Sequence, residues 1–249
     1  MSFAAIASVY DRFNDLTAYQ SWLTFTLGQA GHNHQIVLDL ACGTGYFSRL
    51  LAEHYPQVLG IDLDPAMIEM AQADGLSDNL TFQVGDMLAL ETLEQTFDLV
   101  TCYADSLCFL PDQMSLGQAF RSVYQVLNHQ GLFLFDVWTP YQVCQGFEGF
   151  AYHDEDEDGA LLWTAFPQPT DLAVVHELTV FDRVGLSFDR HQVDLEERTY
   201  PLEAYYQLLS QAGFDLNQVQ VWVDFGAKPY DASLDFTADR WFFVCRKGD

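Results

Sequence analysis

A short stretch near residue 40 combines a carboxylate with two closely spaced glycines. Asp39 lies inside the apolar run 36–40, and the chain continues through Ala41 to Gly43 and Gly45. Glycine adopts backbone conformations that other residues avoid and lets a ligand approach the chain closely. Because ligands of open α/β sheets bind outside the carboxyl ends of strands, this pattern predicts a cofactor over the glycine turn.

Two further acids follow the next apolar runs of the chain. Asp62 comes directly after residues 57–61, and Asp86 with Met87 follows residues 80–84. A carboxylate at Asp62 can accept hydrogen bonds from both hydroxyls of a ribose, whereas Asp86 can accept one from the exocyclic amine of adenine. Either aspartate alone is also typical of a turn or a helix cap. Acids after successive strands, together with the glycine turn, predict an adenosine-containing cofactor.

A dinucleotide is the alternative cofactor. Its fingerprint is G-x-G-x-x-G, in which the third glycine packs the helix on the strand. Ser48 occupies that third position in this chain. The broken pattern disfavours a nicotinamide-dependent oxidoreductase, although the glycine turn alone leaves that class open.

Strand and helix segments alternate along the first 137 residues and resume after residue 200. Strands are predicted at 36–40, 57–61, 80–84, 97–102, 132–137, 219–225 and 241–245, and helices at 17–30, 46–54, 65–74, 113–127 and 201–212. Such alternation is typical of βαβ units, which build a parallel sheet with helices on both faces. The sequence therefore predicts an α/β fold with a Rossmann-like, doubly wound sheet of seven strands.

Residues 139–200 interrupt this pattern with β-like runs and turn signals. Apolar and polar residues alternate through 174–180, which favours antiparallel strands with one covered face. We expect one domain spanning residues 1–249, with core segments 36–138 and 201–249, helices within the N-terminal residues 1–35, and a β-rich insert after the fifth strand on the substrate side. The five consecutive acids at 154–158 are interpreted as a solvated loop.

The composition excludes some partners. The chain has 10 Lys and Arg against 36 Asp and Glu, a net charge of −26, and only two lysines. Binding to nucleic acid or to an anionic membrane needs clustered basic residues, so neither partner is expected. Five cysteines without a CxxC pair indicate reduced thiols rather than a disulfide framework or a zinc site, and we expect no metal. With no basic and apolar leader at the N-terminus, a cytoplasmic location is predicted, and the sequence leaves monomer or homodimer open.

In its order of motifs the chain resembles the class I S-adenosylmethionine-dependent methyltransferases. The matching segments are 37–45, 60–67, 85–87 and 97–101. Segments 105–110, 135–141, 176–179 and 198–200 further resemble a YqeM-like bacterial subfamily, which places a β-rich insert after the fifth strand. Trp138 stands where that subfamily usually has His or a similar polar residue.

The resemblance implies a set of cofactor-binding residues for S-adenosyl-L-methionine. Asp39 and the Ala41 carbonyl would hold the methionine amino group, and Asp62 the ribose. The remaining members would surround the adenine, let the backbone approach the methionine part of the cofactor, or form a lid that closes over it. They are Tyr10, Tyr19, Trp22, Gly43, Gly45, Leu63, Met67, Asp86, Met87 and Tyr103. Tyr10 and Trp22 are also candidates for a cation–π contact with the sulfonium, although Tyr19 and Trp22 equally suit plain helix packing.

Methyl transfer from a sulfonium requires alignment of acceptor, methyl carbon and sulfur more than covalent help from the protein. An alcohol acceptor needs a general base, whereas an amine needs only to be neutral when it attacks. Asp105, directly after the fourth strand, is the first candidate base, and His176 on the insert is the second. Capping explains Asp105 equally well, and strand packing explains His176. The sequence thus predicts methyl transfer to an N or O atom of a small molecule, with a non-catalytic S-adenosylmethionine-binding sensor as the alternative.

Overall fold

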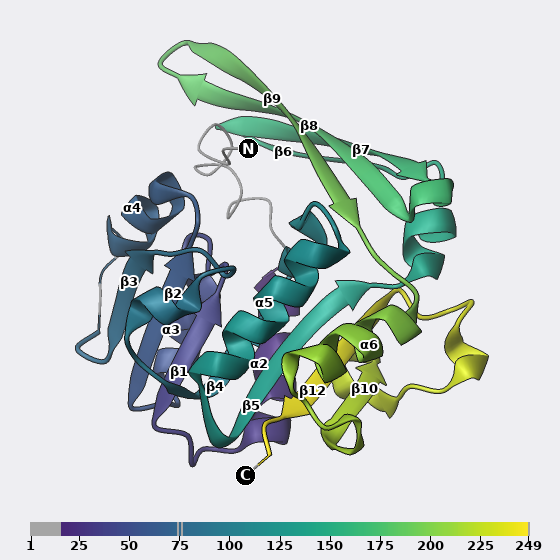
Figure 1. The fold of residues 1–249 in the computed structure, drawn as a ribbon. Helices are drawn as coiled ribbons and strands as arrows, with labels where there is room; N and C mark the ends of the chain where they lie inside the picture. The colour runs from purple at the N-terminus through teal and green to yellow at the C-terminus, as the bar shows by residue number, and fades with distance from the viewer. Residues whose placement is uncertain (1–15, 74, 76, 249) are drawn as a thin grey trace.

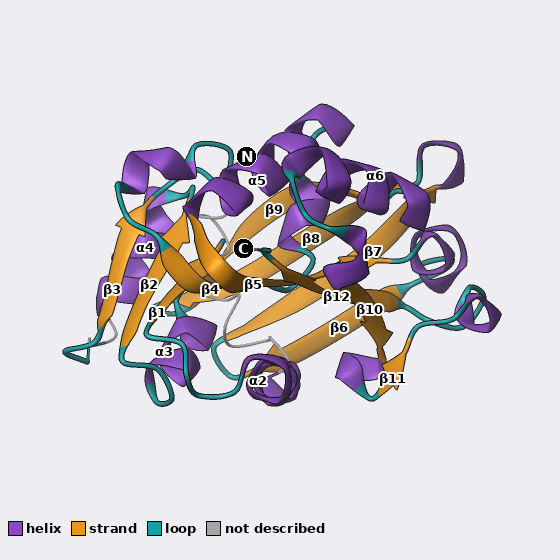
Figure 2. Ribbon diagram, turned by 60° about the horizontal axis from the view of Figure 1, so that its bottom comes forward, coloured by secondary structure: helices purple, strands orange, loops and turns teal. Residues whose placement is uncertain are grey.

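A twisted mixed sheet forms the middle layer of the molecule (Figures 1 and 2). The computed structural model describes residues 16–73, 75 and 77–248. The sheet has the order β11-β10-β12-β5-β4-β1-β2-β3. Its strands are β1 (Ile36–Leu40), β2 (Gln57–Asp62), β3 (Leu80–Val84), β4 (Phe97–Cys102), β5 (Leu127–Trp138), β10 (Val219–Val223), β11 (Lys228–Pro229) and β12 (Arg240–Arg246). Strands β1 to β5 run parallel, and β12 pairs antiparallel with β5.

The predicted doubly wound α/β fold is confirmed, with one difference in strand number. The described part of this sheet has eight strands rather than seven, because Lys228–Pro229 adds a two-residue edge strand to β10. Helix α3 ends at Ala52, two residues earlier than predicted, and β5 begins at Leu127, where a helix end was expected. Local pattern fixed the elements well and their ends less well, since end positions depend on packing.

Helices cover both faces of the sheet. They are α2 (Leu16–Ala30), α3 (Tyr46–Ala52), α4 (Pro65–Ala73), α5 (Gln113–Val126) and α6 (Leu202–Ala212). Helices α5 and α6 pack on one face, and α2, α3 and α4 pack on the other. Gly213 ends α6 in a left-handed conformation at φ 116°, as the sequence predicted.

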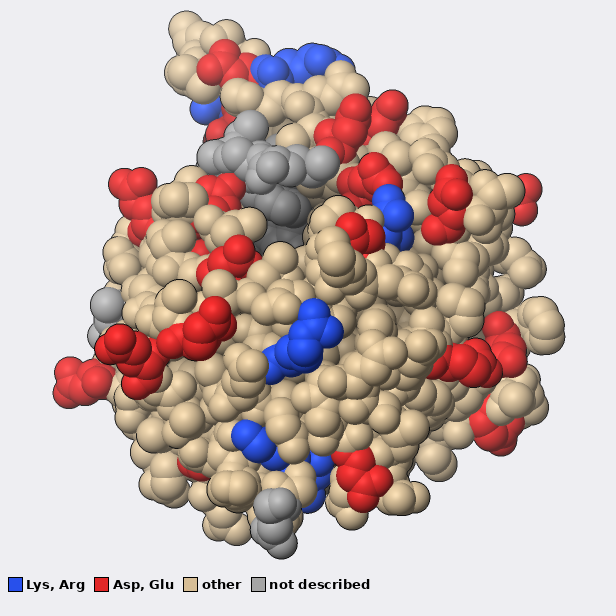
Figure 3. All heavy atoms as spheres, viewed as in Figure 1, with Lys and Arg blue, Asp and Glu red and all other residues tan. Residues whose placement is uncertain are grey.

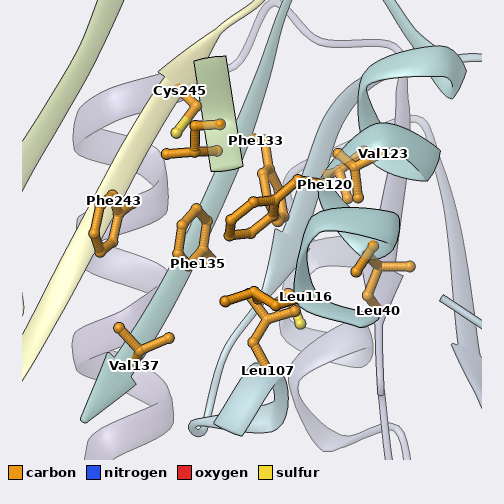
Figure 4. Close-up of a cluster of buried hydrophobic side chains, with 14 of the residues drawn as sticks. Leu40, Leu107, Leu116, Phe120, Val123, Phe133, Phe135, Val137, Phe243 and Cys245 are labelled. Carbon is orange, nitrogen blue, oxygen red and sulfur yellow. The ribbon is translucent and has the colours of Figure 1, made fainter. Parts of the chain in front are cut away.

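The two hydrophobic cores follow the alternation of side chains along β5. Phe133 and Phe135 point toward α5, where Phe120 joins them (Figure 4), whereas Leu132 and Leu134 face the α2 side. All four side chains are buried. A strand that is buried on both faces needs a nearly continuous apolar sequence, and residues 132–135 provide it.

The insert forms a second, antiparallel sheet in the order β6-β7-β8-β9. Its strands are β6 (Ala151–Asp156), β7 (Gly159–Gln168), β8 (Ala173–Val184) and β9 (Ser187–Arg198). Figure 1 shows it over the end of the central sheet toward which the β5 arrow points. The prediction of a loop at 154–158 was wrong in part: Asp154–Asp156 pair with β7, while all three remain exposed. Every residue of this edge strand is exposed, so acids are tolerated there.

Acidic side chains dominate the charged surface. On the face seen in Figure 3, Asp and Glu are scattered over most of the molecule, and Lys and Arg form no extended patch. No helix in the described residues is long and apolar enough to cross a membrane.

Candidate functional site

The glycine turn after β1 adopts the backbone that its sequence predicts. Gly43 has φ +55° and Gly45 has φ +83°. A Cβ at Gly45 would lie 2.4 Å from the Phe82 ring, so this position must be glycine. A Cβ at Gly43 would meet no atom within 4 Å, so its outer side is open to a ligand. The turn is therefore fixed on its inner side and accessible on its outer side.

Asp39 is almost fully buried beneath this turn. One carboxylate oxygen accepts a hydrogen bond from the Ser48 hydroxyl at 2.6 Å, and the other accepts one from Thr101 at 2.8 Å. Burial raises the pKa of Asp39 to about 6, and the two hydroxyls oppose that change. Ser48, which breaks the dinucleotide pattern, thus orients the acid that the resemblance assigns to the methionine amino group.

Asp62 joins the end of β2 to the glycine turn. Its carboxylate accepts hydrogen bonds at 2.9 Å from the backbone N–H groups of Gly43 and Asp64. The side chain is partly exposed, and burial raises its pKa. These contacts hold the carboxylate beside the open side of Gly43, which fits the ribose role predicted for it.

The residues predicted for the adenine side lie after β2 and β3. Leu63 is 69% exposed, whereas Met67 is buried in α4. Asp86 is exposed and accepts a hydrogen bond from the Leu88 N–H at 2.8 Å. Met87 packs partly buried against the core on the α5 side. Glycine turn, ribose acid and adenine residues occupy neighbouring strand ends, which fits an adenosine moiety.

Aromatic side chains of α2 lie behind the turn. The Trp22 ring stacks on Tyr103 at 6.0 Å between centroids and meets the Tyr19 ring edge-on at 5.2 Å. Trp22 is 6% exposed, and its indole N–H donates to Asp136 at 3.0 Å. Both helix packing and a role near the cofactor agree with this position. Tyr10, predicted for the lid, lies outside the described residues.

A second group of charged residues lies at the ends of β4, β5 and β12. Arg240 forms ion pairs with Asp105 at 2.6 Å and with Asp136 at 2.7 Å. Asp136 also accepts the backbone N–H of Asp105 at 3.1 Å. Asp136 is completely buried, and this burial raises its pKa to about 6 although Arg240 opposes the shift. The predicted base Asp105 is thus held by a cation that sequence reasoning missed.

The insert adds His176 from β8 and Glu197 from β9 to this group. The indole N–H of Trp163 donates to His176 Nδ1 at 3.0 Å, and His176 Nε2 lies 3.6 Å from Glu197 Oε1. The indole N–H of Trp138 donates to Glu197 Oε2 at 2.5 Å. We call Asp105, Asp136, His176, Glu197 and Arg240 the polar cluster. It brings both predicted bases together across the two sheets.

Burial sets the protonation of the two insert residues. It lowers the pKa of His176 to about 4, which the charge of Asp105 only partly offsets. It raises the pKa of Glu197 well above its usual range, and Asp105 adds to that change. Because an indole N–H can only donate, His176 accepts at Nδ1, and its ring proton sits on Nε2. His176 is therefore neutral at neutral pH, and burial favours the protonated form of Glu197.

Glu197 gave no recognisable signal in the sequence. It directly follows Glu196 in a strand rich in polar residues, and the two acids differ only in the face of the sheet on which their side chains lie. Glu197 is 4% exposed, whereas the side chain of Glu196 is 49% exposed and pairs with Arg198. One feature of the sequence drew attention to Trp138: the YqeM-like subfamily usually has His or a similar polar residue at this position.

Comparison with known proteins also indicates a methyltransferase. A family model described as a methyltransferase domain matches residues 37–131. YqeM of Bacillus subtilis (strain 168), which carries a methyltransferase name, is 33% identical over 248 residues, covering 99% of this chain and 98% of its own.

Two solved structures share the fold. An S-adenosylmethionine-dependent methyltransferase from Clostridium acetobutylicum is 24% identical with a TM-score of 0.78, covering 98% of this chain and 96% of its own. The sugar N-methyltransferase KedS8 from Streptoalloteichus is 22% identical with a TM-score of 0.76, covering 97% and 93%. Identity with YqeM extends over practically the whole of both chains, and on this basis the chain belongs to the YqeM-like family of S-adenosylmethionine-dependent methyltransferases.

Proposed function

We propose that this chain transfers the methyl group of S-adenosyl-L-methionine to an N or O atom of a small molecule. The observation that carries the proposal is the polar cluster, which places Asp105 beside the strand ends next to the glycine turn while leaving its side chain 14% exposed. The same overall architecture in KedS8, a sugar N-methyltransferase by name, supports a small acceptor. The net charge of −26 argues against a nucleic-acid substrate.

Cofactor binding is assigned to the glycine-turn side. The bound cofactor supplies an already activated methyl group. Asp62 accepts from the ribose hydroxyls, and Asp39 with the Ala41 carbonyl accepts from the methionine amino group. The open backbone at Gly43 allows close approach. The other members of this proposed set are Tyr10, Tyr19, Trp22, Gly45, Leu63, Met67, Asp86, Met87 and Tyr103.

Acceptor activation is assigned to the polar cluster. Asp105 is the group that takes a proton from the acceptor, because it is the most exposed carboxyl of the cluster and borders β4. His176 has its Nδ1 occupied and its Nε2 protonated, so we assign it a positioning role through Glu197.

Five free cysteines are consistent with the cytoplasmic location proposed from the sequence.

Transfer of labelled methyl to a cell extract tests this function. Purified protein, extract and [methyl-³H]S-adenosylmethionine are incubated, macromolecules are retained by ultrafiltration, and labelled products in the filtrate are separated from the unreacted cofactor by chromatography. We expect label in the small-molecule filtrate and its loss with Asp105→Asn, while the affinity for S-adenosylhomocysteine stays unchanged. Label only in retained macromolecules would refute a small acceptor.

A non-catalytic sensor predicts a different pattern in the same experiment. S-adenosylhomocysteine would raise the thermal midpoint by binding the native state, but no fraction would receive label. An equal rise with NADH would instead favour the oxidoreductase alternative.

A further inference from the structure

The turn that carries Asp105 has an unusual backbone. Ala104 has φ +54° and Asp105 has φ +52°, so two successive residues with a Cβ adopt the left-handed conformation. A Cβ disfavours this conformation, and residues other than glycine keep it only where surrounding contacts hold them. The turn directly follows β4 and presents the carboxylate that we assign as proton acceptor. Its placement therefore depends on contacts from outside the turn.

Asp136 on β5 holds Asp105 in two ways. Asp136 Oδ1 accepts the backbone N–H of Asp105 at 3.1 Å. Asp136 Oδ2 accepts a hydrogen bond from the Arg240 guanidinium at 2.7 Å, and the same guanidinium nitrogen lies 2.6 Å from the Asp105 carboxylate. One oxygen thus fixes the backbone of the turn directly, and the other orients the Asp105 side chain through the guanidinium.

The same carboxylate connects the turn to helix α2. Asp136 Oδ2 also accepts the indole N–H of Trp22 at 3.0 Å, and this indole stacks on the Tyr103 ring. The Tyr103 hydroxyl forms a hydrogen bond with Thr26 of α2 at 2.8 Å. Asp136 is completely buried, so water does not compete for its hydrogen bonds. Helix α2 therefore fixes the residue before the turn, and Asp136 fixes the residue that ends it.

We propose that Asp136 is a positioning residue for methyl transfer, which holds the strained turn so that the Asp105 carboxylate stays in place for the acceptor. This inference rests on the proposed function and adds a residue to it. Asp136 has no exposed surface, so it acts through Asp105 rather than on the acceptor itself. The alternative role, a plain counter-ion for Arg240, needs only the contact at Oδ2. The hydrogen bond from Asp105 to Oδ1 distinguishes the two roles.

The variant Asp136→Asn separates these contacts. It keeps the size of the side chain, but only one of its two terminal atoms accepts hydrogen bonds. We expect that oxygen to stay with Arg240 and Trp22, because two donors outweigh one, so that the NH2 group faces the Asp105 N–H. The hold on the backbone of the turn is then lost. The matched control is Asp239→Asn, because Asp239 is exposed and directly precedes Arg240.

Hydrogen exchange, followed by mass spectrometry of overlapping peptides across residues 100–110, tests the contact. In the wild type, the Asp105 amide should exchange about tenfold or more slowly than in an unstructured peptide of the same sequence. Asp136→Asn should remove this protection and leave exchange in β1 and β2 unchanged. Faster exchange throughout the sheet would indicate a structural role only and overturn the proposal. An unprotected Asp105 amide in the wild type would overturn it without any variant.

Kinetics test the consequence for transfer. The small-molecule filtrate of a cell extract supplies the acceptor, and [methyl-³H]S-adenosylmethionine supplies the label. Asp136→Asn should lower the maximal rate about 100-fold, the cost of misplacing a reacting group by about 1 Å. The KM for S-adenosylmethionine and the affinity for S-adenosylhomocysteine should change by no more than about twofold. Asp239→Asn should match the wild type in rate and in affinity.

A second substitution tests whether strain in the turn is the cause. Glycine adopts the backbone of residue 104 without a Cβ penalty, so the turn of Asp136→Asn/Ala104→Gly needs less support. We expect this double variant to transfer methyl about fivefold or more faster than Asp136→Asn alone. Glycine does not replace a missing counter-ion. A double variant as slow as Asp136→Asn would therefore favour the counter-ion role and overturn the proposal.

The outcomes separate this inference from the proposed function. A wild-type rate in Asp136→Asn would overturn the positioning role, and so would a loss of cofactor affinity in proportion to the loss of rate. The methyltransferase function would stand in both cases. If the wild type labels no small molecule, the proposed function fails and the positioning role fails with it, while hydrogen exchange reports on the Asp136–Asp105 contact alone.

Discussion

The two ends of the site hold their carboxylates by different means. On the glycine-turn side, Asp39 and Asp62 accept hydrogen bonds from hydroxyls and backbone N–H groups. In the polar cluster, Asp136 and Asp105 share the Arg240 guanidinium, and indole N–H groups complete the shell.

The difference lies also in sequence separation. Ser48 and Asp39 are 9 positions apart, and Gly43 and Asp62 are 19 apart. In the polar cluster, the Arg240–Asp136 contact spans 104 positions. Contacts between near neighbours leave a motif in the sequence, whereas contacts between distant residues depend on the completed fold. The sequence therefore reveals the end of the site that we propose for the cofactor, whereas the end proposed for the acceptor is recognised only in the folded structure.

The largest effect should come from removing the cation of the polar cluster. Arg240→Met removes the cation that Asp136 and Asp105 share, and we expect the free energy of unfolding to fall by about 3–5 kcal/mol. Urea denaturation followed by circular dichroism measures it. The exposed control Arg190→Met should change stability by no more than about 0.5 kcal/mol. A loss below about 1 kcal/mol for Arg240→Met would remove the contrast between the two ends.

His176 of the polar cluster should make the free energy of unfolding depend on pH. Its pKa is about 4 in the folded chain and 6.5 as the ordinary value, so the unfolded chain binds the proton first. The stability that neutral His176 contributes is thus fully present above pH 6.5, and about 3 kcal/mol of it is lost as the pH falls toward 4. Asp39 and Asp136 titrate in this range with the opposite sign.

Comparison with a variant isolates the histidine. The difference in unfolding free energy between wild type and His176→Gln, measured at both pH values, cancels the aspartates that the two proteins share. We expect the wild type to lose about 3 kcal/mol relative to the variant on acidification. A constant difference would show that His176 is not held neutral.

At the cofactor end, Asp62→Ala should affect binding more than folding. Losing two charge-assisted hydrogen bonds to ribose should weaken S-adenosylhomocysteine binding about 100-fold or more. Isothermal calorimetry gives the affinity, and Glu69→Ala on exposed α4 surface is the matched acid control. Wild-type affinity in Asp62→Ala would contradict the ribose assignment.

The smallest effect should follow from Ser48→Ala. This variant removes one of the two hydroxyl donors to buried Asp39, with an expected cost of about 1–2 kcal/mol in unfolding free energy. Ser21→Ala on the surface of α2 should leave stability nearly unchanged. A loss as large as that of Arg240→Met would mean that both ends depend on one critical partner.

Much of the fold could be predicted because its signals are local. The apolar run of β1, the glycine turn and the proline at the start of α4 each specify an element through its own residues. Strand β6 was missed because its exposed acids suggested a loop, and only pairing with β7 makes it a strand. The edge strand β11 was missed because two residues carry no periodicity.

The sequence by itself determined the end that we propose for the cofactor, because each acid there lies in or just after its own strand and parallel strands bring their carboxyl ends to one edge. It named Asp105 and His176 but supplied no reason for them to meet. Only the tertiary structure joined them, by laying the insert over β4 and β5 so that Glu197 and Arg240 complete the cluster. Ion pairs between residues a hundred positions apart leave no periodic pattern, and burial, which gives them their effect, exists only after folding.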